Sequence, residues 1–331
     1  MKVVQFQESG LDNLKVVETE RPRLGSHDVL LQVMEAGVNP IDYYVVSSIN
    51  VRPMPHVPGA EFAGVVVEVG DHVSDFKPGD RVAVYNRVFD GSCDMCLSSM
   101  EHLCRNGGIM SVVTNGGWAE YVAVPGKNLV KIPEIGWEIA ASLPVSALTA
   151  YHALMSAGLR PGNVVAIFGA SGNTGQFAVQ LAKMMGAEVI AVTGKDWVRE
   201  LGADYVVTAD KAVDEIGKLT GGRMADVVID PLGQSTWTAS IGAVGRRGKW
   251  ITFGQLTGGE VTLSISKLYS SEAWIIGSTG GTRKELSELA KLSPKLKVRV
   301  DKEYDMNDAR NALDRLFSKQ RNGRVMLRIG R

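Results

Sequence analysis

Residues 163–178, N-V-V-A-I-F-G-A-S-G-N-T-G-Q-F-A, limit the possible folds of this 331-residue chain more than any other stretch. An apolar run leads into glycines at 169, 172 and 175, and the apolar spacing of a helix follows. Glycines there allow a tight turn and let a pyrophosphate approach backbone N–H groups at a helix N-terminus. The stretch therefore predicts a nucleotide-binding turn, with these candidate cofactor-binding residues: Ser171, Gly172, Asn173, Thr174 and Gly175.

The middle third of the chain repeats this order of strand then helix. Six short apolar runs read as strands, at 164–168, 188–193, 204–207, 226–230, 249–253 and 274–278. Helical patterns separate most of them, and the clearest covers residues 174–185. Strands and helices that alternate in this way predict a Rossmann-type, doubly wound, six-stranded parallel sheet, and so an α/β fold class.

The rest of the chain has a different pattern. Short β-branched segments at 29–33, 64–69, 80–84 and 119–124 are separated by Gly, Pro and Asp turns, which predicts a mainly β domain. An amphipathic helix near 308–318 and a strand near 324–329 close the chain. We expect residues 1–126 and the return segment 281–331 to form one domain, with the nucleotide domain, 127–280, inserted between them.

The composition excludes several classes of function. Lys+Arg and Asp+Glu number 36 each, so no basic surface favours nucleic acid or an acidic membrane. The first residues lack the apolar core of a secretory signal, and no apolar run is long enough to cross a bilayer. We expect a cytoplasmic protein whose partner is a small-molecule substrate.

The end of the second predicted strand bears on which nicotinamide cofactor is used. An NAD-selective site usually has an acidic residue there, which accepts a hydrogen bond from the ribose 2′-hydroxyl. This chain has Thr193, Gly194 and Lys195 at that turn, with Arg199 one helical turn later. Because the two cations can pair with a 2′-phosphate, the sequence favours NADPH over NADH; the alternative is that both are solvated surface cations.

Three cysteines lie within twelve positions, and they are the only cysteines of the chain. Cys93 and Cys96 form a C-x2-C pair, and Cys104 follows eight residues after the second. Such spacing suits three ligands of a tetrahedral zinc site in a reducing compartment. From the residues alone the fourth ligand stays open.

Several further stretches resemble the medium-chain dehydrogenase/reductase superfamily over essentially the whole chain. They are A-G-V-N-P-I-D-Y-Y (36–44), P-G-A-E-F-A-G-V-V-V-E-V-G (58–70), F-K-P-G-D-R-V (76–82), G-G-W-A-E-Y (116–121) and S-A-L-T-A-Y-H-A-L (146–154). The resemblance implies that the mainly β domain is GroES-like and catalytic. It also implies a nicotinamide in the cleft between the domains, beside the candidate catalytic residues Asn39, Asp42 and Tyr44.

The resemblance also identifies where zinc alcohol dehydrogenases of this superfamily hold their catalytic metal. Those positions carry Asn39, Ala60 and Val145 here, and none of these side chains is a competent zinc ligand. The pattern G-V-N-P-I-D-x-Y with P-G-A-E is similar to the quinone oxidoreductase branch, which uses no catalytic metal. In this interpretation Asn39 and Tyr44 donate hydrogen bonds to the carbonyl oxygen, and Asp42 orients its neighbours.

Other cofactor contacts are implied by position in the family. Thr149 is expected near the nicotinamide half, and Arg324 stands where relatives place an arginine on the pyrophosphate. The ends of the last two sheet strands add Phe253, Gly254, Gly277, Ser278 and Thr279.

For the cysteine cluster, the resemblance supplies a fourth ligand. The structural zinc lobe of the superfamily has the pattern C-x2-C-x2-C-x7-C, and its first position falls on Asp90. A carboxylate oxygen is an acceptable zinc ligand, so we favour Asp90 over His102, which breaks the family spacing. We expect one structural zinc per chain, bound by Asp90, Cys93, Cys96 and Cys104.

These observations predict an NADPH-dependent oxidoreductase that reduces a quinone or an α,β-unsaturated carbonyl without a catalytic metal. One alternative is a zinc-dependent alcohol dehydrogenase, for which His56 and Glu61 are the remaining candidate ligands. A second is a non-catalytic NADPH-binding structural or regulatory protein. The resemblance also implies a homodimer or homotetramer, formed through the strand near 274–276.

Overall fold

The apolar runs of the middle third form one parallel sheet, which confirms the predicted doubly wound architecture. Within residues 149–281 six strands pair in the order β12-β11-β10-β13-β14-β15, and every neighbouring pair is parallel. Their bounds are β10 (Val164–Phe168), β11 (Glu188–Val192), β12 (Tyr205–Val207), β13 (Ala225–Ile229), β14 (Val244–Thr252) and β15 (Trp274–Gly277). The chain order reverses beside β10, where such sheets bind ligands at the carboxyl ends of their strands.

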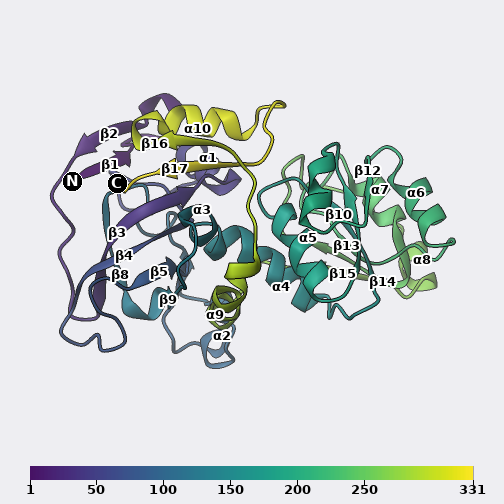
Figure 1. Ribbon diagram of the computed structural model, residues 1–331, viewed down its shortest axis with the longest axis horizontal. Helices are drawn as coiled ribbons and strands as arrows, with labels where there is room; N and C mark the ends of the chain where they lie inside the picture. Colours follow the sequence, from purple (N-terminus) through teal and green to yellow (C-terminus); the bar gives the residue numbers. More distant parts are fainter. Residues whose placement is uncertain (331) are drawn as a thin grey trace. The chain divides into compact units, whose positions relative to one another are not determined.

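Helices connect these parallel strands, as Figure 1 shows for α5 beside β10. Every residue of β10 is buried, as expected for a strand whose two faces are both covered. The helical elements here are α4 (Leu148–Ser156), α5 (Gly175–Met184), η5 (Asp196–Leu201), α6 (Ala212–Leu219), α7 (Trp237–Gly242) and α8 (Ile265–Ser270).

The remaining residues build the mainly β unit that the short β-branched segments predict. The structure is a computed structural model that describes residues 1–330. In residues 1–148 and 282–330, the largest sheet has the order β16-β17-β3-β4-β5-β9, with β8 also paired to β3. The strands of this unit are β1 (Lys2–Gln5), β2 (Lys15–Glu18), β3 (Asp28–Gly37), β4 (Phe62–Val69), β5 (Arg81–Val84), β6 (Arg87–Val88), β7 (Gly108–Ile109), β8 (Tyr121–Pro125), β9 (Leu129–Lys131), β16 (Val300–Asp305) and β17 (Arg324–Arg328).

The helices of this unit are short and lie around the sheet. They are α1 (Pro40–Ser47), α2 (Asp94–Leu97), α3 (Trp137–Ala140), α9 (Arg283–Leu292) and α10 (Ala309–Leu316), with single turns η1 (Leu11–Asn13), η2 (Glu101–Leu103), η3 (Gly126–Asn128), η4 (Leu143–Ala147), η6 (Ser293–Lys295) and η7 (Met306–Asp308). The return segment begins with a capping box, in which Thr282 and Glu285 satisfy N–H groups at the start of α9.

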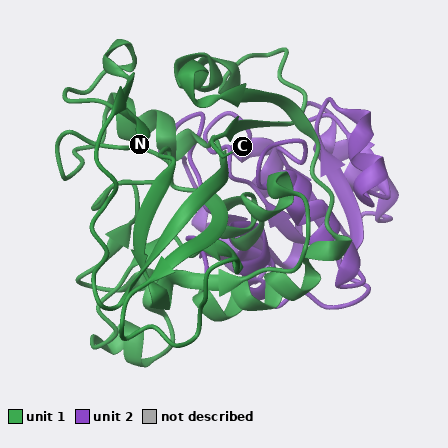
Figure 2. Cartoon of the chain, turned by 60° about the vertical axis from the view of Figure 1, so that its left-hand side comes forward, with its two compact units in different colours: residues 1–148, 282–331 green, residues 149–281 purple. Residues whose placement is uncertain are grey.

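The two units divide the chain at Leu148 and Thr282 (Figure 2). The first division lies beyond the boundary predicted at residue 126. The difference arises because residues after 126 still belong to the first sheet: β9 pairs antiparallel with β5. No helix among the described residues is both long and apolar enough to span a membrane.

The final strand completes the first sheet from its interior. β17 pairs with β16 on one side and, antiparallel, with β3 on the other. Its residues Arg324 to Leu327 are buried. Two chain segments separated by the whole second unit therefore share one sheet and one apolar core.

Glu35 is an acidic residue buried in this sheet, where it pairs in register with Arg328 of β17. Burial is the largest cause that raises the pKa of Glu35 from 4.5 to about 8, and the nearby carboxylates of Glu303 and Glu138 add to it. The fold therefore favours the protonated side chain, whereas the unfolded chain ionises near the ordinary pKa. This group's contribution to stability is full below about pH 4.5 and falls as the pH rises toward 8.

We expect Glu35→Gln to be more stable than the wild type at pH 8.5, by on the order of 2–4 kcal/mol, and similar to it near pH 4.5. Urea unfolding across this pH range measures the difference. Glu68→Gln, at an exposed position of the neighbouring strand β4, is the matched control and should leave the pH profile unchanged. A gain for Glu35→Gln that does not depend on pH would contradict the prediction.

Candidate functional site

The glycine-rich turn has the geometry of a phosphate-binding loop. Gly169 follows β10 with φ of +66°, and its carbonyl accepts the backbone N–H of Gly172 at 2.8 Å. α5 begins at Gly175, where a Cβ would lie inside the contact radius of the Gly169 carbonyl oxygen and 2.8 Å from backbone carbons of Ala170. Only glycine fits at position 175, and the open turn leaves helix N-terminal N–H groups for a pyrophosphate. The residues present therefore fit a dinucleotide.

Side chains at the end of β11 lie beside this turn. The hydroxyl groups of Ser171 and Thr193 are 2.8 Å apart, and the backbone N–H of Lys195 donates to the Thr193 hydroxyl at 3.3 Å. Ser171, Thr193, Gly194 and Lys195 therefore gather at one rim of the sheet. Arg199 has other partners: its Nε donates to Asp196 at 2.9 Å, and its Nη1 donates to the carbonyl of Asp204 at 3.1 Å. These bonds weaken the sequence argument for a 2′-phosphate.

The other predicted cofactor contacts of this unit lie at the same ends of the sheet or on α4. The backbone N–H of Ser278 donates to the carbonyl of Thr252, so the ends of β14 and β15 meet. This pairing brings residues 253–254 and 277–279 to the carboxyl edge of the sheet. Thr149 is buried near the start of α4.

In the first unit, Asp42 serves the local fold. One carboxylate oxygen accepts the backbone N–H of Asn39 and the other that of Ala60, each at 2.8 Å. Burial raises the pKa of this fully buried carboxyl group to about 7. Tyr44 lies two residues later on α1, 36% exposed, with its ring edge-to-face against Tyr43. Of the three predicted catalytic residues, Tyr44 is the most exposed.

Asn39 belongs to a buried network around Glu61 that the sequence did not reveal. Its side-chain amide donates to Glu61 Oε2 at 2.7 Å. The Ser146 hydroxyl lies 3.2 Å from the same oxygen, and Arg324 Nη2 forms an ion pair with it. Glu61 Oε1 accepts the backbone N–H groups of Val145 at 3.0 Å and Ser146 at 2.5 Å. The sequence carries no signal for this ion pair, because 263 positions separate Glu61 from Arg324.

These positions test whether a catalytic zinc fits. An amide, a methyl group and an isopropyl group stand at Asn39, Ala60 and Val145, and the nearby Glu61 carboxylate is already surrounded by donors. His56 cannot replace the missing ligands, because its two ring nitrogens lie 3.1 and 2.9 Å from backbone carbonyl oxygens of Pro53 and Ser111. The residues do not fit a three-ligand catalytic zinc.

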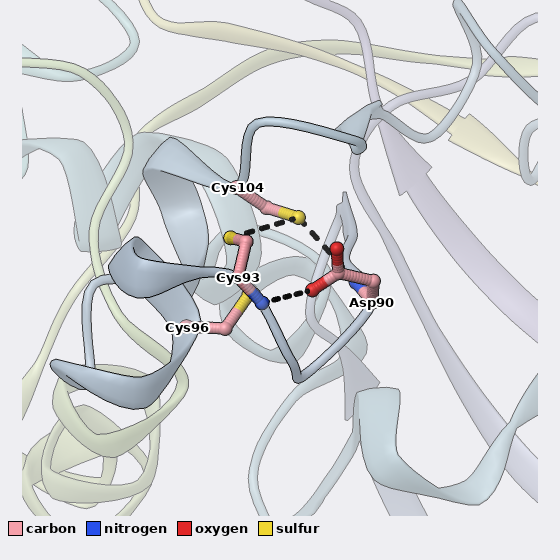
Figure 3. A group of neighbouring side chains, drawn as sticks. All are labelled: Asp90, Cys93, Cys96 and Cys104. Atoms are coloured by element: carbon pink, nitrogen blue, oxygen red, sulfur yellow. Dashed lines mark hydrogen bonds between the residues drawn. The ribbon is translucent and has the colours of Figure 1, made fainter.

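The cysteine cluster forms the second candidate site (Figure 3). Asp90, Cys93, Cys96 and Cys104 each direct one ligand atom inward, and these atoms all lie within 4.8 Å of one another. The sulfurs of Cys93 and Cys104 are 3.9 Å apart, close to the edge of roughly 3.8 Å that a tetrahedron with zinc–sulfur bonds of about 2.3 Å would have. His102, the other proposed ligand, is not a member of this cluster among the described residues.

The loop also prepares Asp90 as an anionic ligand. One of its oxygens accepts the backbone N–H groups of Ser92 at 2.7 Å and Cys93 at 3.0 Å. The other accepts the amide of Asn106 at 2.6 Å. These donors, Ser92 first, hold the pKa of Asp90 well below its ordinary value, so the carboxylate is ionised at neutral pH. The donor set and its spacing fit a closed, structural zinc site.

A carboxylate of the cysteine lobe also contacts the return segment of the chain. Glu101 of η2 accepts the backbone N–H of Arg283, the first residue of α9, at 2.6 Å. The Arg283 side chain donates to the carbonyl of Leu129 at 2.9 Å. The lobe and the start of the return segment are therefore fixed to one another within the first unit.

Known proteins match both units. Residues 25–134 match the family model for the alcohol dehydrogenase GroES-like domain, and residues 174–294 match that for zinc-binding dehydrogenases. A NAD-dependent alcohol dehydrogenase of Sulfolobus acidocaldarius is 33% identical over 99% of this chain and 100% of its own length. An alcohol dehydrogenase of Geobacillus stearothermophilus is 35% identical over 96% of each chain.

Solved structures give the same picture. A thermostable alcohol dehydrogenase from Pyrobaculum aerophilum is 42% identical, with a TM-score of 0.92 over 99% of both chains. A second structure of it contains cobalt and zinc.

The relatives overturn the prediction of quinone or enone reduction, which is wrong. The prediction used the missing zinc ligands to choose between branches, but proteins similar along the whole chain are named alcohol dehydrogenases. The preference for NADPH is likewise without support from them, because the named cofactor of several is NAD.

Proposed function

Because the chain belongs to the medium-chain dehydrogenase/reductase superfamily, we propose that it is an alcohol dehydrogenase that transfers hydride between a nicotinamide cofactor and an alcohol or its carbonyl product. The observation that carries this proposal is similarity to alcohol dehydrogenases over 99% of the chain. The phosphate-binding geometry of residues 169–175 supports it independently.

Particular residues are assigned to each part of the reaction. The turn at Ser171–Gly175 binds the pyrophosphate, and Thr193 with Lys195 lies beside the adenosine ribose. When bound, the nicotinamide supplies hydride to the carbonyl carbon or accepts it from the alcohol. Tyr44 donates a hydrogen bond to the substrate oxygen as negative charge develops there, and the proton is exchanged with solvent. No step uses a metal at Asn39, Ala60 and Val145.

NADH is the proposed cofactor. The relatives named as NAD-dependent support this choice. The Arg199 side chain is bonded to Asp196 and to the carbonyl of Asp204. Among residues 193–199, Lys195 is therefore the one cation left for a 2′-phosphate. The zinc of this chain is assigned to Asp90, Cys93, Cys96 and Cys104. A closed four-ligand site stabilises the fold and takes no part in hydride transfer.

Steady-state assays of the purified chain test the function. Primary and secondary alcohols with NAD⁺ or NADP⁺, and aldehydes and ketones with NADH or NADPH, are compared by nicotinamide absorbance. We expect turnover in both directions with preference for NADH, and a fall in kcat for Tyr44→Phe of about 10- to 100-fold. No turnover with any alcohol or carbonyl compound, or turnover of quinones alone, would contradict the proposal.

We also propose that two copies associate through β15. This strand is at the edge of the sheet, and its residues Trp274 and Ile275, which point to opposite faces, are 43% and 40% exposed. α8, just before it, exposes Ile265 and Tyr269, so apolar surface adjoins the open edge. Unpaired backbone groups of an edge strand can pair with the same strand of a second copy.

Ile275→Lys should therefore convert a dimer to a monomer at micromolar concentration, since it places a charge in that edge. Light scattering after gel filtration measures the mass. Val213→Lys, at an exposed position of α6, is the control and should keep the dimer. A wild-type monomer, or an unchanged mass for Ile275→Lys, would show that this edge is not the interface.

A further inference from the structure

We infer that His27 and His72 form a two-histidine chelate for a divalent transition-metal ion on the surface of the first unit. The site is separate from the cysteine cluster. It goes beyond the proposed hydride transfer, because no residue assigned to the reaction or to the cofactor takes part in it. The bound ion ties the turn before β3 to the turn after β4.

The first observation is the distance between the two rings. Nδ1 of His72 lies 3.3 Å from Nε2 of His27, and the ring centroids are 4.7 Å apart. Zinc binds histidine nitrogen at about 2.0–2.1 Å, so two nitrogens on one tetrahedral ion are roughly 3.3–3.4 Å apart. The two nitrogens therefore already have the separation that a shared ion requires.

These nitrogens are joined by one hydrogen bond, in which one ring donates and the other accepts. A metal ion replaces the shared proton once the donating ring takes up its other tautomer, so that both nitrogens offer a lone pair. Both side chains are exposed, so the rings can turn to direct these lone pairs at one ion. Among residues 1–330 no carboxylate or thiol joins this pair in a three-ligand group, so water supplies the remaining ligands.

The second observation is that backbone hydrogen bonds hold the two turns together. The backbone N–H of His72 donates to the carbonyl of Ser26 at 2.9 Å, and that of Gly70 donates to the carbonyl of Asp28 at 2.8 Å. β3 and β4 pair antiparallel beside these turns. Rings that are 45 positions apart in the sequence are thus brought together by bonds that do not involve the rings. A pair positioned in advance loses less conformational freedom when it binds an ion.

The third observation is that His27 and His72 are the exposed histidines of the chain. Of the five histidines, His56 and His102 are buried, and His152 is half-buried on α4 of the second unit. Imidazole nitrogen is a preferred ligand of Ni²⁺, Cu²⁺ and Zn²⁺, whereas Mg²⁺ prefers oxygen. The choice of metal therefore separates binding by this pair from binding by surface carboxylates.

Titration with Ni²⁺ of the full chain, its cysteine cluster loaded with zinc, tests the site by calorimetry. We expect one Ni²⁺ per chain in the wild type. The Kd should rise at least about tenfold in His27→Gln and in His72→Gln, since each variant leaves one ligand. His152→Gln is the matched control and should bind Ni²⁺ as the wild type does. Mg²⁺ should give no binding at the same concentrations.

Thermal unfolding gives a second readout that does not depend on turnover. Ni²⁺ at about 100 times its wild-type Kd should raise the melting temperature of the wild type by about 5 °C, because the ion links two turns of the folded unit. At the same concentration, either glutamine variant should gain no more than about half of that. No Ni²⁺ binding by the wild type, a wild-type Kd in both variants, or an equal response to Mg²⁺ would overturn the inference.

Discussion

Gly175→Ala is expected to abolish nucleotide binding, raising the Kd for NADH by at least about 100-fold, or roughly 2.7 kcal/mol. The reason is steric: the new Cβ would overlap the carbonyl oxygen of Gly169 and lie 2.8 Å from backbone carbons of Ala170. Since backbone atoms form the obstacle, the turn must open, and its N–H groups would then lose their common direction. Isothermal titration calorimetry with NADH measures the effect.

The matched control is Gly217→Ala in α6 of the same unit. A Cβ there makes only an ordinary contact of 3.6 Å with the sulfur of Met224, and alanine favours a helix over glycine by about 1 kcal/mol. This control should bind NADH normally and melt no lower than wild type. If Gly175→Ala kept a Kd within about threefold of wild type, the turn would not be the phosphate site.

Removing one ligand of the cysteine cluster is expected to give the second large effect. In Asp90→Asn the side chain becomes neutral, and in Cys104→Ser a thiolate is lost. We expect zinc after dialysis to fall from about one per chain to below about 0.2 in both, because a structural site needs all four ligands. If free zinc is present at about 1,000 times its Kd, losing the bound zinc removes about 4 kcal/mol from the free energy of unfolding.

Metal analysis and thermal unfolding with and without added zinc measure both consequences. Asp94→Asn is the control, since Asp94 is an exposed acid of the same lobe that pairs with Arg105 and is absent from the cluster. The control should keep its zinc. Zinc retained by Asp90→Asn but lost from His102→Asn would show that the alternative ligand is the correct one.

The second unit could be predicted from the sequence because each part of its pattern is local. The apolar runs, the glycine turn and the amphipathic helix at 174–185 lie close together along the chain, so spacing alone indicates their structure. Spacing likewise indicated the three cysteines of the zinc cluster, whereas the fourth candidate ligand, Asp90, came from the family resemblance.

The centre around Glu61 could not be predicted in this way. Its partners lie 22, 85 and 263 residues away, and nothing near Arg324 in the sequence indicates which carboxylate it meets. Arg199 shows that a local signal can also mislead. Its charge suggested a phosphate contact, but its guanidinium donates a hydrogen bond to the neighbouring carboxylate of Asp196. The predicted substrate class was wrong because it was inferred from the missing zinc ligands at positions 39, 60 and 145. The side chains that line the substrate pocket select the substrate, and the absence of zinc ligands does not identify them.

The late insertion of β17 has a consequence for the synthesis of the chain. A ribosome releases the whole second unit, residues 149–281, before the strand that fills the gap between β16 and β3 exists. The nucleotide-binding unit can therefore fold while the first sheet still lacks β17 and Glu61 is not yet paired with Arg324. Nascent chains stalled before residue 324 should accordingly resist proteases in the second unit and be cleaved in the first. The growing chain completes its first-made domain last.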